Sequence, residues 1–305
     1  MRKYFSCSAV LVSLLLNQAF AQTGDAGNTG LSFLKIGIGG RGAALAEAHV
    51  ADATGAEATF WNPANLASSS GGELYLSHSE WLQDITNDFV AVKFGGGKSF
   101  WGVSLLLQNV PGIMQRTRPS AEPISELTSH HIAFGLSYAR QFSSKLNGGV
   151  TVKYLAEKIL NYASNGFGVD LGVRYKTSPE SPFALAASIH NLGSVEEFRT
   201  EDVKLPTYLR AGLVFAPDFK LGNSSPNLFA SVRSVLDAKT IFNFGAEILP
   251  HDVVAVRLGY QGGNETQSLA GGLGLKSGNY RFDYSYSPAD FDFGNSHRFS
   301  LAIKL

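Results

Sequence analysis

The fold class is decided by the segment RFSLAIKL, residues 298–305. Apolar side chains occupy every second position and alternate with polar or small ones, which is typical of a β-strand with one apolar face. The same alternation occurs in YRFDYSYS, residues 280–287, and in FGVDLGVRY, residues 167–175. In a soluble sandwich the polar face lies outside, whereas in a membrane barrel the apolar face meets lipid and the polar face lines the lumen. Alternation alone leaves both architectures open.

The first residues favour export. The basic pair Arg2 and Lys3 precedes an apolar run at residues 5–16, and AFA at residues 19–21 has the small-x-small pattern of a cleavage site. The apolar run is shorter than the roughly 20 residues that a membrane-spanning helix needs. We therefore expect residues 1–21 to be a cleaved signal peptide, and a membrane anchor is the alternative.

Composition excludes several classes of function. The chain has 25 basic and 25 acidic residues, so it lacks the excess positive charge typical of nucleic-acid-binding proteins. Its only cysteine, Cys7, lies in the predicted signal peptide, so we expect no disulfide, thiolate nucleophile or cysteine-based metal site in the mature chain. Charged residues make up 16% of the chain, against about 25% in soluble proteins. An exported chain of this kind can span a membrane as a closed barrel, in which every backbone group pairs between strands.

The sequence thus predicts an all-β protein, a transmembrane antiparallel β-barrel of about fourteen strands at residues 73–305. We expect it in the cell outer membrane, surrounded by outer-membrane lipid. An even number of strands places both ends of the barrel on the periplasmic side, with short turns there and longer external loops, such as residues 109–128. The predicted strands lie near residues 73–79, 88–94, 99–108, 129–142, 146–158, 166–176, 183–191, 206–216, 227–236, 241–249, 253–261, 267–276, 279–287 and 296–305.

The segment before the barrel, residues 22–72, does not have the pattern of a strand. Residues 42–51 (GAALAEAHVA) are rich in alanine and have good helix propensity. Asn62-Pro63 then stops a helix and starts a turn. Because its small residues allow close backbone packing, we expect this segment to be a partly helical plug or hatch inside the barrel lumen, with Asn62 capping or bridging backbone groups. A periplasmic extension outside the barrel is the alternative.

Residues 33–67 (FLKIGIGGRGAALAEAHVADATGAEATFWNPANLA) resemble the N-terminal signature of the PorV/PorQ family, which belongs to the broader group similar to the FadL long-chain fatty-acid transporters. The resemblance implies a fourteen-stranded outer-membrane barrel. Where many relatives carry Gly-Gly or Gly-Asp after an Ala-Leu or Ala-Met pair, this chain has Ala46-Glu47. The plug motif that carries the resemblance comprises Arg41, Trp61, Asn62, Pro63 and Ala64.

Charged residues occur on the strand face that we assign to the lumen. They form either a polar pathway or a set of interior ion pairs that fill the barrel and hold the plug. The second interpretation is favoured because an unpaired buried charge is costly. The residues are Asp170, Arg174, Arg210, Glu247, Arg257, Arg281, Asp283 and Arg298.

Motifs for catalysis and cofactor binding are weak. Residues 37–42 satisfy G-x-G-x-x-G, but no βαβ unit follows, and three glycines occur easily by chance in a glycine-rich chain. The pairs Ser129/His131 and Ser188/His190 each share a strand face, but the sequence shows no third orienting residue for either pair. The histidines lack metal-binding spacing. We expect no catalytic residues, no cofactor and no metal site.

Three classes of function remain. The resemblance to PorV/PorQ implies a non-catalytic role in type IX protein secretion or surface-protein handling, with other secretion-machinery proteins or secreted cargo as partners. A FadL-like channel would instead pass a hydrophobic small molecule through a lumen gated by the plug. A barrel enzyme using one of the Ser/His pairs is the third. The sequence predicts them in that order, and identifies neither cargo nor solute.

Overall fold

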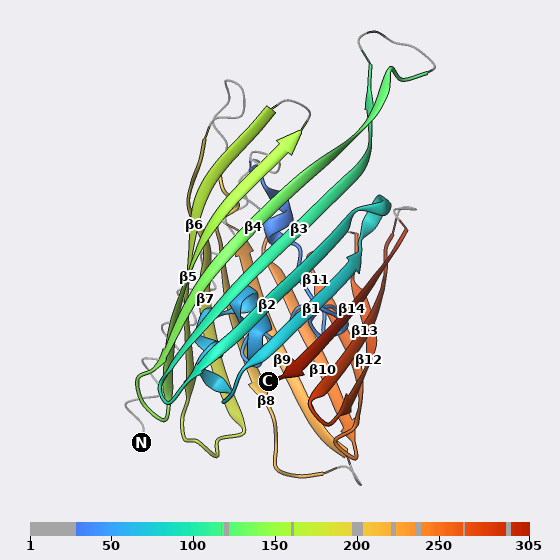
Figure 1. Ribbon diagram of the computed structural model, residues 1–305. Helices are drawn as coiled ribbons and strands as arrows, with labels where there is room; N and C mark the ends of the chain where they lie inside the picture. Colours follow the sequence, from blue (N-terminus) through green and yellow to red (C-terminus); the bar gives the residue numbers. More distant parts are fainter. Residues whose placement is uncertain are drawn as a thin grey trace.

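The computed structural model describes residues 29–116, 118, 122–159, 162–196, 204–220, 224–235, 239–264, 266–290 and 294–305. The predicted signal peptide, residues 1–21, lies outside this part of the chain. Within it, fourteen antiparallel strands form a closed barrel in which each strand pairs with the next and β1 pairs with β14 (Figure 1). The predicted fold class is confirmed. No helix of the described residues is long and apolar enough to cross a membrane.

Each strand expected from the sequence corresponds to an observed strand, with ends that differ by a few residues in most cases. The strands are β1 (Glu73–Glu80), β2 (Thr86–Gly96), β3 (Ser99–Gln115), β4 (Ser125–Gln141), β5 (Leu146–Ile159), β6 (Tyr162–Lys176), β7 (Phe183–Val195), β8 (Tyr208–Phe215), β9 (Ser224–Val235), β10 (Ile241–Pro250), β11 (Val254–Gly262), β12 (Leu269–Ser277), β13 (Tyr280–Pro288) and β14 (Asn295–Lys304). A short 3₁₀ turn, η4 (Leu82–Asp84), connects β1 to β2.

The β3–β4 hairpin is longer than predicted and projects beyond its neighbours (Figure 1). The sequence predicted a loop over residues 109–128, which was wrong because β3 and β4 continue to pair as far as Gln115 and Ser125. The register shifts between Val110 and Ile113. Pro111 cannot donate a backbone hydrogen bond and Gly112 has a φ of 75°, so these two residues break the alternation on which the prediction relied.

Side chains along the strands point alternately to the two faces of the wall. On β13, Phe282 is 52% exposed on the outer face, whereas its neighbour Asp283 is only 4% exposed on the inner face. The outer surface of the barrel is therefore apolar, and polar side chains are enclosed. This is the reverse of a soluble protein and fits a barrel whose outer face meets lipid.

The residues before β1 form a plug inside the barrel, seen in blue in Figure 1. Nearly all plug residues from Leu31 to Ala67 are buried, and they contact strands on several sides of the lumen. The plug therefore fills the space that the strands enclose. Its elements are η1 (Ser32–Lys35), α2 (Gly40–Ala44), η2 (Gly55–Glu57), α3 (Ala58–Trp61) and η3 (Pro63–Ser68).

The alanine-rich run forms less helix than its composition predicts. Helix α2 ends at Ala44, and Ala46 and Glu47, which follow its C-cap residue Leu45, have φ angles of 48° and 64°. This left-handed region costs a residue with a side chain more than it costs glycine. The bend directs the Glu47 carboxylate to two arginines of the wall, Arg210 and Arg233. Tertiary contacts therefore override the local helix propensity.

Glycines of the wall allow the plug backbone to approach closely. A Cβ at Gly149 on β5 would lie 2.5 Å from both the Ala64 nitrogen and the Pro63 carbonyl carbon. A Cβ at Gly272 on β12 would lie 2.5 Å from the Ala44 Cβ. The absence of a side chain at these positions is thus a condition for the plug to fit.

We predict that Gly149→Ala destabilises the folded protein by about 1–3 kcal/mol, the usual result of overpacking a tight contact. Unfolding by urea in lipid vesicles, followed by tryptophan fluorescence, measures the change. Gly96→Ala is the matched control, because a Cβ at Gly96 would meet no atom within 4 Å. Equal losses of stability in the two variants would contradict the close packing at Gly149.

Candidate functional site

The Asn62-Pro63 turn is anchored to the inner wall. The Asn62 side chain accepts a hydrogen bond from the Ala64 backbone nitrogen at 3.0 Å, which caps η3. Its amide nitrogen donates to the carbonyl oxygens of Val173 at 3.1 Å and Ala187 at 3.4 Å, on β6 and β7. Asn62 is completely buried, so these bonds satisfy a side chain that water does not reach.

Trp61 fills the centre of the plug. It is fully buried, and the guanidinium carbon of Arg210 lies 4.6 Å from the centre of its ring. His49 packs edge-on against it, with ring centres 4.7 Å apart. A cation above an aromatic face is attracted by the π electrons, and more strongly where water is excluded. Trp61 thereby links the plug to Arg210 of β8.

Seven charged side chains of alternating sign connect the plug to the wall. Arg41 binds Asp52 at 2.7 Å within the plug and Glu247 at 3.1 Å on β10. Across the wall, Arg257 bridges Glu247 at 2.6 Å and Asp283 at 2.8 Å. The chain of ion pairs returns to the plug at Glu57. In order, its members are Asp52, Arg41, Glu247, Arg257, Asp283, Arg281 and Glu57.

A second group of charges surrounds Glu47. Its carboxylate accepts from Arg210 at 2.9 Å and Arg233 at 3.0 Å, and also from the backbone nitrogen of Gly37 at 3.1 Å. Arg298 donates to the Gly37 carbonyl oxygen at 2.6 Å. These contacts join β8, β9 and β14 to the plug.

The charged residues expected on the lumen face all lie inside the barrel, where the structure gives each of them a partner. Arg174 donates to the carbonyl oxygen of Ala51 in the plug at 3.0 Å. Asp170 is paired within the wall, and Lys153 at 2.7 Å is among its partners. The sequence analysis missed the plug carboxylates Glu47, Asp52 and Glu57, although three acidic residues among the small residues of 42–58 were a visible signal.

Residues 37–42, the G-x-G-x-x-G segment, attach the plug to the wall on the β1–β14 side. The backbone nitrogens of Gly39 and Gly40 donate to the hydroxyls of Ser77 and Ser300, each at 3.1 Å. Backbone donors that a nucleotide phosphate would need are therefore bound to the barrel. The segment serves as an attachment in this structure.

The Ser188/His190 pair has a third partner that sequence analysis did not find. Ser188 Oγ lies 2.8 Å from His190 Nε2, and His190 Nδ1 lies 3.2 Å from an oxygen of Asp170 on the adjacent strand. The order of groups is that of a serine hydrolase. However, Ser188 is buried on the inner wall and does not line the internal cavity described next. The Ser129/His131 pair also bonds at 2.8 Å, but Glu157 contacts the same ring nitrogen at 3.5 Å.

A small cavity of about 30 Å³ lies between the plug and the wall. This is about the space that one water molecule takes in the liquid. Side chains from the plug and from β2, β3 and β4 make one side apolar, and side chains from β5 to β8 make the other polar. The apolar side includes Leu34, Phe60, Phe89, Leu106 and Ala133, and the polar side includes Lys153, Asp170, His190 and Tyr208.

Comparison with known proteins identifies related folds. No protein-family model and no curated protein sequence matches the chain. The toluene transporter TodX of Pseudomonas putida has a TM-score of 0.57 at 10% sequence identity, with 86% of this chain and 98% of TodX covered. A FadL homologue of Pseudomonas aeruginosa has a TM-score of 0.54 at 10% identity, with 88% and 98% covered. The chain has the fold of the FadL-like barrels.

We predict that Glu247→Gln loosens the plug. The substitution leaves Arg41 and Arg257 without their shared carboxylate, and breaking a buried ion pair typically costs about 3–5 kcal/mol. Limited proteolysis of the purified protein should cleave within residues 31–72 much faster than in the parent chain. Glu180→Gln, in an exposed turn, is the control. An unchanged cleavage rate in Glu247→Gln would show that the ion pairs do not hold the plug.

The pH dependence of plug docking follows from Glu57. Burial raises the pKa of Glu57, but the Arg281 guanidinium 3.0 Å away, together with His49 and Arg41, outweighs this effect, and the pKa falls from 4.5 to about 2. A lowered carboxylate pKa stabilises the folded state fully above pH 4.5, and this stabilisation disappears as the pH falls to 2. We predict that acid increases protease cleavage of the plug over this range, and that Glu57→Gln removes this part of the pH dependence.

Proposed function

We propose that the protein is an outer-membrane channel that passes small hydrophobic compounds and is gated by its N-terminal plug. Residues 1–21 would direct its export. The FadL-like fold supports this proposal, and a protein of similar fold is described as a toluene transporter. The choice reverses the order of functions expected from the sequence, in which protein secretion came first.

One observation carries the proposal: the interior contains a large apolar region next to the cavity. The sequence analysis treated the lumen face as mostly polar, but several inward side chains of the wall are large and apolar, including Phe89, Leu106 and Leu155. They form one cluster with Phe33 and Leu34 of the plug. An apolar cluster with a few polar groups beside it is the usual lining of a site for a small organic molecule.

The plug fills the lumen, so passage requires it to rearrange. The cavity is smaller than a hydrocarbon such as toluene, and Phe60 and Leu34 form its plug side. Movement of this part of the plug would enlarge the cavity while the ion pairs of Arg41 and Glu57 stay formed. We therefore expect a local rearrangement of the plug during transport.

Secretion of proteins is the second candidate. It is supported by the resemblance of residues 33–67 to the PorV/PorQ family and by the projecting β3–β4 hairpin. On the side of β3 that faces β2, pairing ends at Asn109, so in the described residues the rest of that strand edge has no neighbouring strand. An unpaired strand edge can form backbone hydrogen bonds with a strand of another protein. In this function the plug would be a structural element, and its movement would not be needed.

A disulfide between plug and wall distinguishes the two functions. A Cβ at Gly102 on β3 would meet the Cγ2 of Thr59, the plug residue next to Phe60, so cysteines at these two positions lie close enough to pair. The double variant Thr59→Cys/Gly102→Cys should fix this part of the plug to the wall when oxidised. We predict that a deletion strain carrying it takes up a small aromatic hydrocarbon at the background rate, and that a reductant restores uptake.

The single variant Thr59→Cys is the control, and it should support uptake with or without reductant. Secretion of surface proteins is assayed in the same strains. Unimpaired uptake by the oxidised double variant would contradict a gating plug. Loss of secretion in the deletion strain, together with its rescue by the locked variant, would favour the secretion function.

A further inference from the structure

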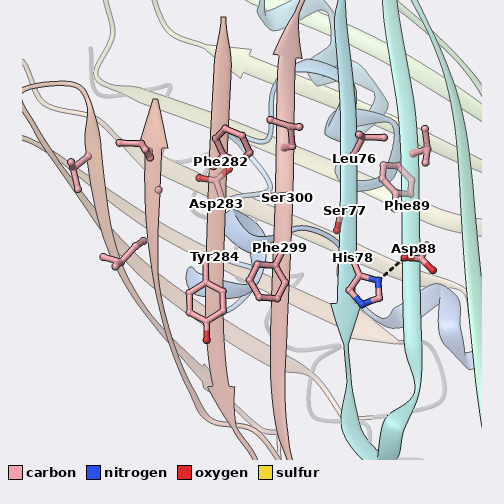
Figure 2. A pocket seen from close by; sticks show the side chains of 16 residues that line it. Leu76, Ser77, His78, Asp88, Phe89, Phe282, Asp283, Tyr284, Phe299 and Ser300 are labelled. Atoms are coloured by element: carbon pink, nitrogen blue, oxygen red, sulfur yellow. Dashed lines mark hydrogen bonds and ion pairs between the residues drawn. The ribbon is translucent and has the colours of Figure 1, made fainter. Parts of the chain in front are cut away.

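An apolar groove of about 720 Å³ crosses the outer face of the barrel (Figure 2). One wall of this groove is a row of paired outward side chains that runs from Val254 on β11 through Phe282 and Leu301 to Val90 on β2. The row crosses five strand spacings, or roughly 24 Å at about 4.8 Å per strand. All its members are apolar.

The second wall is the next row along the strands. It begins with Leu273 on β12, continues through Tyr284 and Phe299, and ends with His78 and Asp88 on β1 and β2. The two rows are two residues apart, roughly 7 Å along a strand. An alkyl chain lying along the groove would contact apolar side chains of both rows.

The polar end of the groove is unusual for a surface that faces lipid. His78 Nδ1 lies 2.7 Å from Asp88 Oδ1, and the two side chains are 47% and 43% exposed (Figure 2). With a neutral His78 imidazole, the pair carries the negative charge of the Asp88 carboxylate. With a protonated imidazole, the two charges cancel. Among the described residues, no lysine or arginine forms an ion pair with Asp88. Glu80, the next outward residue of β1, adds further negative charge.

We propose that this groove binds one phospholipid of the surrounding membrane whose headgroup carries a primary ammonium group. The acyl chain lies between the two apolar rows, and the ammonium donates to the Asp88 carboxylate. A charge facing lipid is costly, and a cationic partner reduces that cost. His78 and Asp88 also lie farther than Leu76 and Val90 from the barrel end that carries Leu305, so the headgroup points away from that end. This proposal does not depend on the transport function.

Native mass spectrometry of the full-length protein tests the proposal. The protein, extracted in mild detergent, is incubated with equal amounts of phosphatidylethanolamine and phosphatidylglycerol of the same acyl chains, and the lipids it retains are counted. We expect one phosphatidylethanolamine to be retained at least five-fold more often than phosphatidylglycerol. Asp88→Asn should abolish this preference, and Leu301→Trp, which fills the groove, should lower retention of both lipids.

Two matched variants control for the substitutions themselves. Glu126→Gln makes the matching change from carboxylate to carboxamide at an exposed position of the projecting hairpin, and Leu171→Trp enlarges an outward leucine on β6, so both should retain lipid like the parent chain. Heat-modified gel migration verifies that every variant is folded. Equal retention of the two lipids by the parent chain would overturn the ammonium assignment. Unchanged retention in folded Leu301→Trp would overturn the groove itself.

Discussion

The ion pair between Arg41 of the plug and Glu247 of the wall is the interaction on which the interior depends. Both side chains are enclosed, and each is connected through further ion pairs to another part of the molecule. Neither charge could be buried alone, because removing an ion from water costs several kcal/mol that only good partners offset. The plug and the barrel therefore require each other: the wall supplies partners for Arg41, Glu47 and Glu57 of the plug, and the plug supplies the carboxylate that Arg210 and Arg233 of the wall share.

This interdependence limits how the plug can move. Complete withdrawal would separate Arg41, Glu47 and Glu57 from the wall at once, and it would leave Arg210 and Arg233 of the lumen without their carboxylate partner. In the described part of the chain, the apolar side of the plug around Leu34 and Phe60 forms no ion pair with the wall, although Tyr208 donates to the Leu34 carbonyl oxygen at 3.4 Å, and this side borders the cavity. Local rearrangement on that side is consequently less costly than displacement of the whole segment. The structure separates a part of the plug that is held by ion pairs from a part that is held by packing and by hydrogen bonds such as the one from Arg233 to the Lys35 carbonyl oxygen at 2.8 Å.

Sequence patterns predicted the strands because the signal is local. Alternation is visible in any stretch such as residues 298–305, and it also assigns Asp283 and Arg298 to the lumen face. The partners of these residues were not predictable, since pairing between strands and plug joins residues far apart in the chain. Asp170, for example, completes the contacts of His190 only because β6 lies beside β7. The bend at Ala46 and Glu47 likewise depends on arginines that follow more than 160 residues later.

The same wall serves two environments with alternate side chains. On β13, Phe282 faces the outer groove and the next residue, Asp283, faces the interior. On β14, Phe299 faces the groove and the next residue, Ser300, faces the plug. The backbone of Asp283 and Ser300 forms the floor of the groove, one sheet thick. Because a shift of one residue in register would exchange the two faces, the charges inside also fix which apolar side chains meet the lipid. The ion pairs that hold the plug thus determine the outer surface as well as the lumen.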